Sequence, residues 1–369
     1  MDADVVVVGA GIVGAALAFG AAKLGKKVIV LDGEDGDLRA ARANFGLVWV
    51  QGKGASNPAY SILSLESSDA WPSFISELVE LVEMRVDYQR SGGLNICLGE
   101  DEFNNRAALL QRMHNQQTGA GTEMIERNQL ETLIPAVKFG PEVVGASFCR
   151  FDGVVNPLQL LAALQKGIRR LDGQILFRCP VTAIVPLDDG FSVKTDARSY
   201  RSKTVIVAAG LAIPSLTEPL GLKIPLRSER GQLLVTERIE EILPLPASGL
   251  RQTADGTVMI GATKEAETDR GVTVASATKL ASKATRIIPA LADVRLVRQW
   301  SGFRVMPLDG APIYAESKQY PGLFAAACHS GVTLAATHAS RLVSAMVEGR
   351  LSQDFAAFSN GRFDVQKCA

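Results

Sequence analysis

The sequence predicts an α/β protein in which a discontinuous, mainly parallel sheet is interrupted by an inserted, mainly antiparallel α+β part. Two observations predict this fold. The chain opens with a buried strand, a glycine-rich turn and a helix of small residues, which is how a doubly wound parallel sheet begins. Buried apolar segments of the same type return at 203–210 and 322–348, and strands with one polar face lie between them.

The opening unit has the pattern that places a helix N-terminus against a phosphate. Residues 4–8 are an apolar strand, and the glycine-rich turn follows directly. Gly9 permits the tight turn, Gly11 lets a pyrophosphate approach the backbone, and Gly14 lets the helix lie close to the sheet. The turn consists of Gly9, Ala10, Gly11, Ile12, Val13 and Gly14.

A second strand, 28–31, ends at Asp32, at the spacing of about 20 residues where an acidic side chain can bind a ribose diol. The turn and Asp32 together predict a dinucleotide that contains ADP; a glycine-rich turn without a ligand is the alternative. An NAD dehydrogenase more often shows an uninterrupted series of βα units. The interrupted pattern therefore favours a flavin enzyme, with a discontinuous Rossmann-like FAD-binding domain and an inserted substrate domain.

Caps, breakers and periodicity predict the remaining elements. Residues 91–93 separate two strand-like runs and predict a hairpin of 84–89 with 94–98. Asn156 and Pro157 form a cap and first turn for a helix. The expected helices are 101–117, 127–133, 158–171, 276–288 and 332–349, and the expected strands are 174–178, 181–186, 191–195, 203–209 and several within 225–260.

Composition narrows the class of protein. At 369 residues the chain suits two domains, and its apolar fraction of 47% fits a globular protein. Lys+Arg and Asp+Glu both number 39, which argues against nucleic acid or an anionic membrane as the main partner. No apolar run approaches the ~20 residues of a membrane helix. Because the first strand begins at the N-terminus, we expect no signal peptide and a cytoplasmic protein.

Five further motifs resemble the D-amino-acid oxidase/glycine oxidase family of FAD enzymes. In the strongest of them, Trp300-Ser301-Gly302-Phe303-Arg304 precedes Asp309-Gly310-Ala311-Pro312, which resembles the family signature W-x-G-hydrophobic-R followed by D-G-x-P. The resemblance spans essentially the whole chain. The other motifs are the loop 39–47, the strands 180–184 and 205–210, and Arg230-Gly231-Gln232.

The resemblance implies that several segments hold FAD, and that they hold it without a covalent bond. Covalently flavinylated relatives place a cysteine after the Gly-hydrophobic-Arg signature, where this chain has Met306-Pro307-Leu308. In the family the main chain at the Val181 position binds adenine, and the helix that begins after Gly331 points at the flavin. Besides the opening turn and Asp32, the implied FAD-binding residues are Arg39, Arg42, Asn44, Phe45, Gly46, Leu47, Val181, Ala209, Gly210, Gly302, Ser330, Gly331, Val332 and Thr333.

Arg304 and His329 are the expected catalytic residues. In the family the arginine at the Arg304 position holds the substrate carboxylate, a task that suits a permanently charged, two-pronged guanidinium. Outside such a signature, an arginine after a strand is more often a surface ion-pair residue. His329 is either a substrate contact or a structural residue near the flavin, and Cys328 replaces a glycine that is usual in the family.

The run 43–54 resembles the catalytic β subunits of opine oxidases, of the octopine and nopaline type, and of D-hydroxyproline dehydrogenases. This resemblance implies oxidation of the Cα–N bond of a secondary-amine amino acid to an imine, which hydrolyses to an amino acid and a keto acid. Partner subunits with flavin and iron–sulfur centres would accept the electrons, and the family places an FMN at the partner interface. The five cysteines of this chain include no CxxC pair of the kind a cluster needs.

Two alternatives stay open at this point. One is a dehydrogenase subunit of the D-hydroxyproline, proline or sarcosine type, which a cavity sized for a five-membered ring would favour. The other is a non-catalytic, FAD-bearing scaffold, which an Arg304 paired away from the flavin would favour. The expected FAD-binding domain comprises 1–83, 140–222 and 301–369, and the expected substrate and interface domain comprises 84–139 and 223–300.

Overall fold

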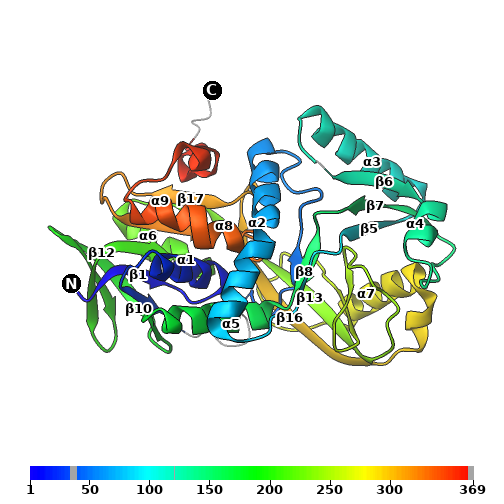
Figure 1. Ribbon diagram of the computed structural model, residues 1–369, viewed down its shortest axis with the longest axis horizontal. Helices are drawn as coiled ribbons and strands as arrows, with labels where there is room; N and C mark the ends of the chain where they lie inside the picture. The colour runs from blue at the N-terminus through cyan, green and yellow to red at the C-terminus, as the bar shows by residue number, and fades with distance from the viewer. Residues whose placement is uncertain (34–39, 120, 365–369) are drawn as a thin grey trace.

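The computed structural model describes residues 1–33, 40–119 and 121–364, and its largest unit is an eight-stranded sheet (Figure 1). The strand order is β10-β11-β12-β1-β2-β9, and β18 pairs with both β12 and β17. The pairings of β1 with β12 and β2, of β2 with β9 and of β12 with β18 are parallel. The strands are β1 Ala3–Val8, β2 Val28–Leu31, β9 Gln174–Leu176, β10 Val181–Leu187, β11 Gly190–Thr195, β12 Ser199–Val207, β17 Ile313–Glu316 and β18 Leu323–Ala327.

The sheet is buried on both faces, as its apolar strands require. Along β1, Val5 and Val7 enter the core on the helical face, whereas Val6 and Val8 enter a second core on the opposite face. The short helix α6, Ile213–Thr217, contributes to the second core. The helical face is covered by α1 Ile12–Lys23, α2 Pro58–Val82, α5 Pro157–Arg170, α8 Ala335–Thr337, the π-helical turn η5 His338–Leu342 and α9 Val343–Val347.

The other part of the molecule is mainly antiparallel and lies to the right in Figure 1. A four-stranded sheet, β14-β15-β13-β16, shares one apolar core with a three-stranded sheet, β5-β7-β6. A third sheet, β3-β8-β4, has only short strands. The strands are β3 Leu47–Val48, β4 Tyr88–Gln89, β5 Gly93–Leu98, β6 Thr122–Glu126, β7 Val143–Cys149, β8 Gly153–Val155, β13 Leu226–Arg238, β14 Leu250–Gln252, β15 Thr257–Gly261 and β16 Leu296–Pro307; the helices are α3 Gly99–Asn115, α4 Arg127–Leu133 and α7 Val274–Ile287.

This architecture confirms the predicted fold class and most of its elements. Helix α4 has the expected bounds, and α3, α5 and α7 differ from expectation by one or two residues at each end. Asn156 caps α5 as predicted, because its side-chain oxygen accepts hydrogen bonds from the amides of Leu158 and Gln159 at 3.1 and 3.2 Å. Within the described ranges, no helix is long and apolar enough to cross a membrane.

The hairpin expected around Gly92 and Gly93 is wrong. β4 pairs with β8 and β5 pairs with β7, so β4 and β5 are successive parts of one interrupted ladder rather than partners. The glycines make room for aromatic rings: a Cβ on Gly92 would lie 2.5 Å from the ring of Phe148, and one on Gly93 would lie 2.5 Å from the ring of Trp49. Close packing against these rings, rather than a tight turn, accounts for Gly92 and Gly93.

Strand pairing differs from the expected domain boundaries in two places. We expected 140–222 and 301–369 to belong to the FAD-binding domain. Strand β7 instead pairs with β5 and β6 of the antiparallel half, and β16 crosses position 301 without a break. The helix expected from residue 332 begins later, with α8 at Ala335, and continues through the π-helical turn η5. The division into domains otherwise stays a prediction.

The 25-residue helix α2 was not expected from the sequence. Its buried face includes the polar residues Ser64, Ser67 and Ser68, which hide the apolar periodicity that would otherwise indicate a helix. Two of these hydroxyls bond to distant backbone: Ser67 donates to the carbonyl of Thr333 at 2.8 Å, and Ser68 donates to that of Phe151 at 2.6 Å. α2 therefore connects the two halves by polar contacts.

Candidate active site

The glycine-rich turn has the backbone geometry that its sequence predicts. Gly9 has a φ of +104°, and a Cβ there would lie 2.6 Å from the carbonyl oxygen of Ala208. A Cβ on Gly14 would lie 2.0 Å from the carbonyl oxygen of Gly9. A Cβ on Gly11, by contrast, would have no atom of residues 1–33, 40–119 or 121–364 within 4 Å. Gly9 and Gly14 therefore serve close packing, whereas Gly11 leaves open space at the N-terminus of α1.

Within the part of the chain that the structure describes, no side chain caps that N-terminus. Gly11 is the N-cap of α1 and provides no side-chain hydrogen bond, and the first turn contains no acidic residue. The amides that begin a helix carry partial positive charge and need an acceptor. The open space at Gly11 has room for the pyrophosphate that the sequence predicts there, and this placement stays a prediction.

Asp32 is buried beside the turn. Its Oδ2 accepts a hydrogen bond from the amide of Ala10 at 2.6 Å, so the carboxylate holds the turn, and its contact with a ribose stays a prediction. The backbone of Asp32 also bonds to the segment that precedes β10, because the amide of Cys179 donates to the Asp32 carbonyl at 2.8 Å. This contact brings the start of β10, at Val181, close to the turn. Ala209 and Gly210 follow directly on Ala208, which packs on Gly9.

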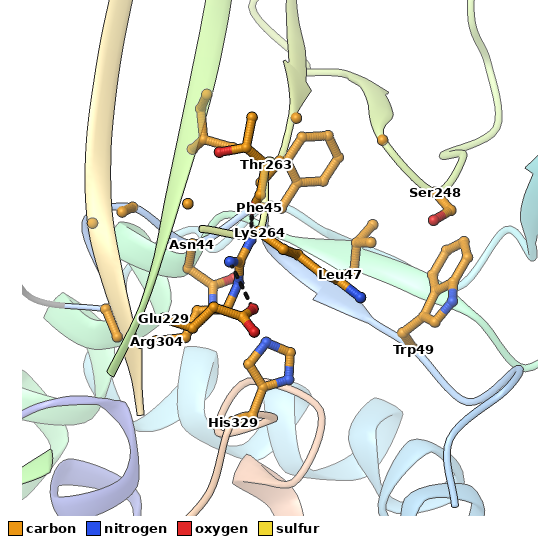
Figure 2. A pocket seen from close by; sticks show the side chains of 18 of the residues that line it. Asn44, Phe45, Leu47, Trp49, Glu229, Ser248, Thr263, Lys264, Arg304 and His329 are labelled. Carbon is orange, nitrogen blue, oxygen red and sulfur yellow. Dashed lines mark hydrogen bonds and ion pairs between the residues drawn. The ribbon is translucent and has the colours of Figure 1, made fainter. Parts of the chain in front are cut away.

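A cavity of about 830 Å³ lies between the large sheet's helices and the four-stranded sheet (Figure 2). The expected residues on its wall are Asn44, Phe45, Leu47, Gly302, Arg304, His329, Ser330, Val332 and Thr333. Residues that sequence reasoning did not single out are also on its wall, among them Trp49, Lys53, Arg227, Glu229, Thr263, Lys264, Lys279 and Lys283. Arg42 is exposed and is not among the described wall residues, and Arg39 lies outside the described residues.

Several glycines bring the cavity walls together. A Cβ on Gly302 would lie 2.2 Å from the Cβ of Ala43, so β16 and the loop before β3 touch there. Gly46 has a φ of +78°, and a Cβ there would lie 2.2 Å from Nη1 of Arg251. A Cβ on Gly331 would lie 2.9 Å from Val13 of α1. The last contact links the glycine-rich turn directly to the segment that lines the cavity.

Arg304 reaches the cavity from β16, directly opposite Glu229 on β13. Its Nη1 lies 3.1 Å from Oε1 of Glu229, and its Nη2 donates to the carbonyl of Thr263 at 2.9 Å. Figure 2 shows both contacts as dashed lines. Gly231 makes the space, since a Cβ there would lie 2.6 Å from Nη2 of Arg304. This contact gives the glycine of the Arg230-Gly231-Gln232 motif a physical reason.

His329 also lies on the cavity wall (Figure 2). Its ring is open to the cavity but closely surrounded by protein, and this burial lowers its pKa from the usual value to about 3, assisted by the charges of Lys53, Arg304 and Lys264. The imidazole is therefore neutral at pH 7. These three cations, which line the same cavity, come from different segments of the chain.

The segment from Ser330 to Thr333 is held from two sides. The Ser330 hydroxyl accepts hydrogen bonds from the ammonium group of Lys53 and, at 2.6 Å, from the hydroxyl of Tyr60 on α2. The Thr333 hydroxyl accepts from the amide of Trp49 at 3.1 Å, and its carbonyl accepts from the indole of Trp71 at 2.9 Å. These partners lie far away in sequence, so single-residue patterns did not reveal them.

A buried polar network stands behind the loop that carries Lys53. Asp152 is fully buried and accepts hydrogen bonds from the amide of Val50 at 2.5 Å and the side chain of Gln51 at 2.6 Å. Gln51 in turn accepts from Arg106 and Ser147, both at 2.7 Å. Burial raises the pKa of Asp152 to about 6, although these hydrogen bonds oppose the shift.

Comparison with known proteins assigns the family. The family model "DAO: FAD dependent oxidoreductase" matches residues 4–345. The chain belongs to this family. The opine oxidase B subunit of Agrobacterium tumefaciens (strain Ach5) is 40% identical over 367 residues, which cover 99% of both chains. The opine oxidase B subunit of Rhizobium meliloti is 39% identical over 367 residues with the same coverage.

Among solved structures, glycine oxidase from Geobacillus kaustophilus has the same fold as this FAD-dependent oxidoreductase. The TM-score is 0.88 at 24% sequence identity, over 97% of this chain and 98% of that chain. The residues of this chain fit FAD: the open space at Gly11 faces uncapped amides, and the segment 329–333 joins that turn to the cavity through Gly331 and Val13.

Proposed function

We propose that this FAD-dependent oxidoreductase oxidises the Cα–N bond of a secondary-amine amino acid of the opine type, for which octopine and nopaline are examples. The imine product hydrolyses to an amino acid and a keto acid. FAD, held without a covalent bond, supplies the hydride acceptor. The observation that carries the proposal is the position of Arg304 on the wall of a large cavity; the 40% identity to an opine oxidase B subunit supports the substrate class.

Arg304 retains the donors that a carboxylate needs. Its Nη1 donates to Glu229 at 3.1 Å and to the carbonyl of Arg230 at 3.4 Å, and its Nη2 donates once, to Thr263. A guanidinium has five N–H donors. The Nε–H and one Nη2–H therefore have no partner within the described residues, so donors remain for the charge-assisted hydrogen bonds that a carboxylate accepts. Glu229 and Thr263 would fix the orientation of the guanidinium.

The charge of the cavity favours an uncharged substrate amine. Hydride loss from Cα needs the nitrogen lone pair, so a protonated amine does not react. The charges of Lys53, Arg304 and Lys264 act on His329, and nearby cations lower the pKa of an ammonium group. His329, neutral at pH 7, adds no charge to that environment. The chain's contribution is then mainly positioning and electrostatics.

The smaller-substrate and scaffold alternatives are tested by one experiment. The purified protein is mixed anaerobically with octopine, nopaline, D-hydroxyproline, proline, sarcosine and D-alanine, and flavin absorbance is followed. We expect octopine-like secondary amines to bleach the flavin fastest. Bleaching by sarcosine or the cyclic amino acids alone would favour the smaller substrate, and no bleaching by any compound would favour the scaffold.

We further propose that electrons leave to partner subunits that carry flavin and iron–sulfur centres, with FMN held at the interface. The opine oxidase relatives are named as subunits, which supports a complex, and within the described ranges no group of His, Cys, Asp and Glu side chains is arranged to hold a metal ion. The isolated chain should be reduced quickly by substrate and reoxidised slowly by air. Rapid peroxide-producing turnover by the chain alone would contradict this proposal.

A further inference from the structure

The charged side chains on the cavity wall are mostly cationic. The described wall residues include Lys53, Arg227, Lys264, Lys279, Lys283 and Arg304, whereas Glu229 is the only acidic residue among them. Glu229 is already paired, because its two oxygens lie 3.1 Å from Nη1 of Arg304 and 3.1 Å from Nη1 of Arg227. Within the described wall, no carboxylate is therefore left to bind a cationic group of a ligand.

Lys264 is the cation with the least protein compensation near Arg304. It directly follows Thr263, whose carbonyl accepts the hydrogen bond from Arg304, and in Figure 2 its side chain extends into the cavity. Among the described residues, no carboxylate lies within ion-pair distance of Lys264. Lys283, on the same cavity wall, has a partner in Glu102 at 3.5 Å. Lys264 thus presents a full charge to whatever the cavity binds.

The residues on both sides of Lys264 are fixed by partly buried hydrogen bonds. The Thr263 hydroxyl accepts from the amide of Gln232 at 2.9 Å and donates to Glu265 at 2.6 Å. Glu265 is also paired with the buried Arg230 at 2.6 Å. Because its neighbours are held to β13, Lys264 projects from a rigid frame, as a ligand-binding side chain should.

We propose that Lys264 binds a second carboxylate of the substrate while Arg304 binds the first, so that the cavity prefers secondary amines that carry two carboxylates over amines that carry only one. This inference rests on the proposed function and narrows its substrate class. Lys264 acts as a specificity-determining residue: it sets which end group is accepted. It takes no part in breaking the Cα–N bond.

Three unreactive probes isolate the end group. Glutarate, valerate and 4-guanidinobutyrate share a carboxylate on three methylenes and end in a carboxylate, a methyl and a guanidinium group. Binding to the FAD-loaded protein is measured by calorimetry and by perturbation of flavin absorbance at constant ionic strength. We expect glutarate to bind about tenfold more tightly than valerate, as one charge-assisted contact provides, and 4-guanidinobutyrate to bind more weakly than valerate.

Variants assign the effect to Lys264. In Lys264→Met, glutarate should bind no better than valerate, while valerate affinity and FAD content change less than twofold; Lys264→Arg should restore most of the preference. Lys283→Met, which removes a charge that Glu102 already compensates, should keep the wild-type preference. An unchanged glutarate preference in Lys264→Met, or 4-guanidinobutyrate binding as tightly as glutarate, would overturn the proposal.

The two proposals fail separately. If opines bleach the flavin but Lys264→Met keeps the glutarate preference, the inference about Lys264 is wrong and the proposed function stands. If no secondary amine bleaches the flavin while the glutarate preference still depends on Lys264, the two-carboxylate site is supported and the proposed reaction is wrong.

Discussion

The glycine-rich turn and the cavity place their functional groups in opposite ways. The turn is one short contiguous segment, and backbone geometry alone explains Gly9, Gly11 and Gly14. The cavity takes side chains from the loop after β2, from β13, from the segment after β15, from β16 and from the segment after β18. The difference teaches that a backbone site can be recognised locally, whereas a side-chain site depends on strand register and on long-range hydrogen bonds.

The largest effects should come from glycines of the turn, and two of them separate binding from folding. Gly11→Leu should abolish FAD binding but leave the protein folded, because the new side chain enters the open space that the pyrophosphate needs. Gly14→Leu should unfold the protein, because a Cβ there would lie 2.0 Å from the carbonyl of Gly9. Flavin absorbance per protein and the thermal transition distinguish the two. A Gly11→Leu protein with a full flavin complement would refute the assignment of the turn.

The cavity side should show a pH-dependent stability that originates in Asp152. Burial raises the pKa of Asp152 to about 6. In the folded protein Asp152 therefore keeps its proton over a pH range in which the same carboxyl group of the unfolded chain has lost it. Stability should therefore fall as pH rises from about 4 to about 6, by roughly 3 kcal/mol. Urea unfolding of the wild type and of Asp152→Asn at pH 4, 5, 6 and 7 measures the difference between them. A constant difference would show that Asp152 is not buried as described.

Asp32 is the side chain that holds the glycine-rich turn, through its hydrogen bond from the amide of Ala10. Its variants therefore test how far the turn depends on a side chain as well as on backbone geometry. Asp32→Ala should weaken FAD binding by roughly 1–3 kcal/mol, the range for a charged hydrogen-bond partner. Asp32→Asn keeps an oxygen for the amide of Ala10, now 2.6 Å away, and should lose less. Fluorescence titration of the apoprotein with FAD measures both. Equal losses in the two variants would mean that the charge, rather than the hold on the turn, sets affinity.

The sequence could predict whatever depends on local rules. The glycine turn, the cap at Asn156 and the bounds of α4 need only backbone sterics and neighbouring residues. The Arg304 position was predicted through a family signature, and the structure places it on the cavity wall. Its partner Glu229 was not predicted, since their contact exists only because β13 and β16 pair in one particular register.

The missed features share a physical cause. Helix α2 was hidden because buried serines on it satisfy distant carbonyls, and such bonds have no periodicity in the sequence. Lys53 and Lys264 look like surface lysines in a chain of balanced charge, and only the fold directs them into one cavity. The prediction of a hairpin at Gly92 was wrong because a local glycine pattern was read as a turn, whereas these glycines make room for rings that are distant in sequence.

The most direct test of the account is anaerobic rapid mixing of the wild type, Arg304→Lys and Arg304→Ala with the opine that bleaches the flavin fastest. Lysine keeps the charge but loses the two-pronged edge, so both variants should retain FAD and lose kcat/KM by about a hundredfold or more. The limiting reduction rate should fall along with substrate affinity. Near-full activity of Arg304→Lys, or loss of FAD from both variants, would contradict the role of Arg304 as the carboxylate-binding residue of the cavity.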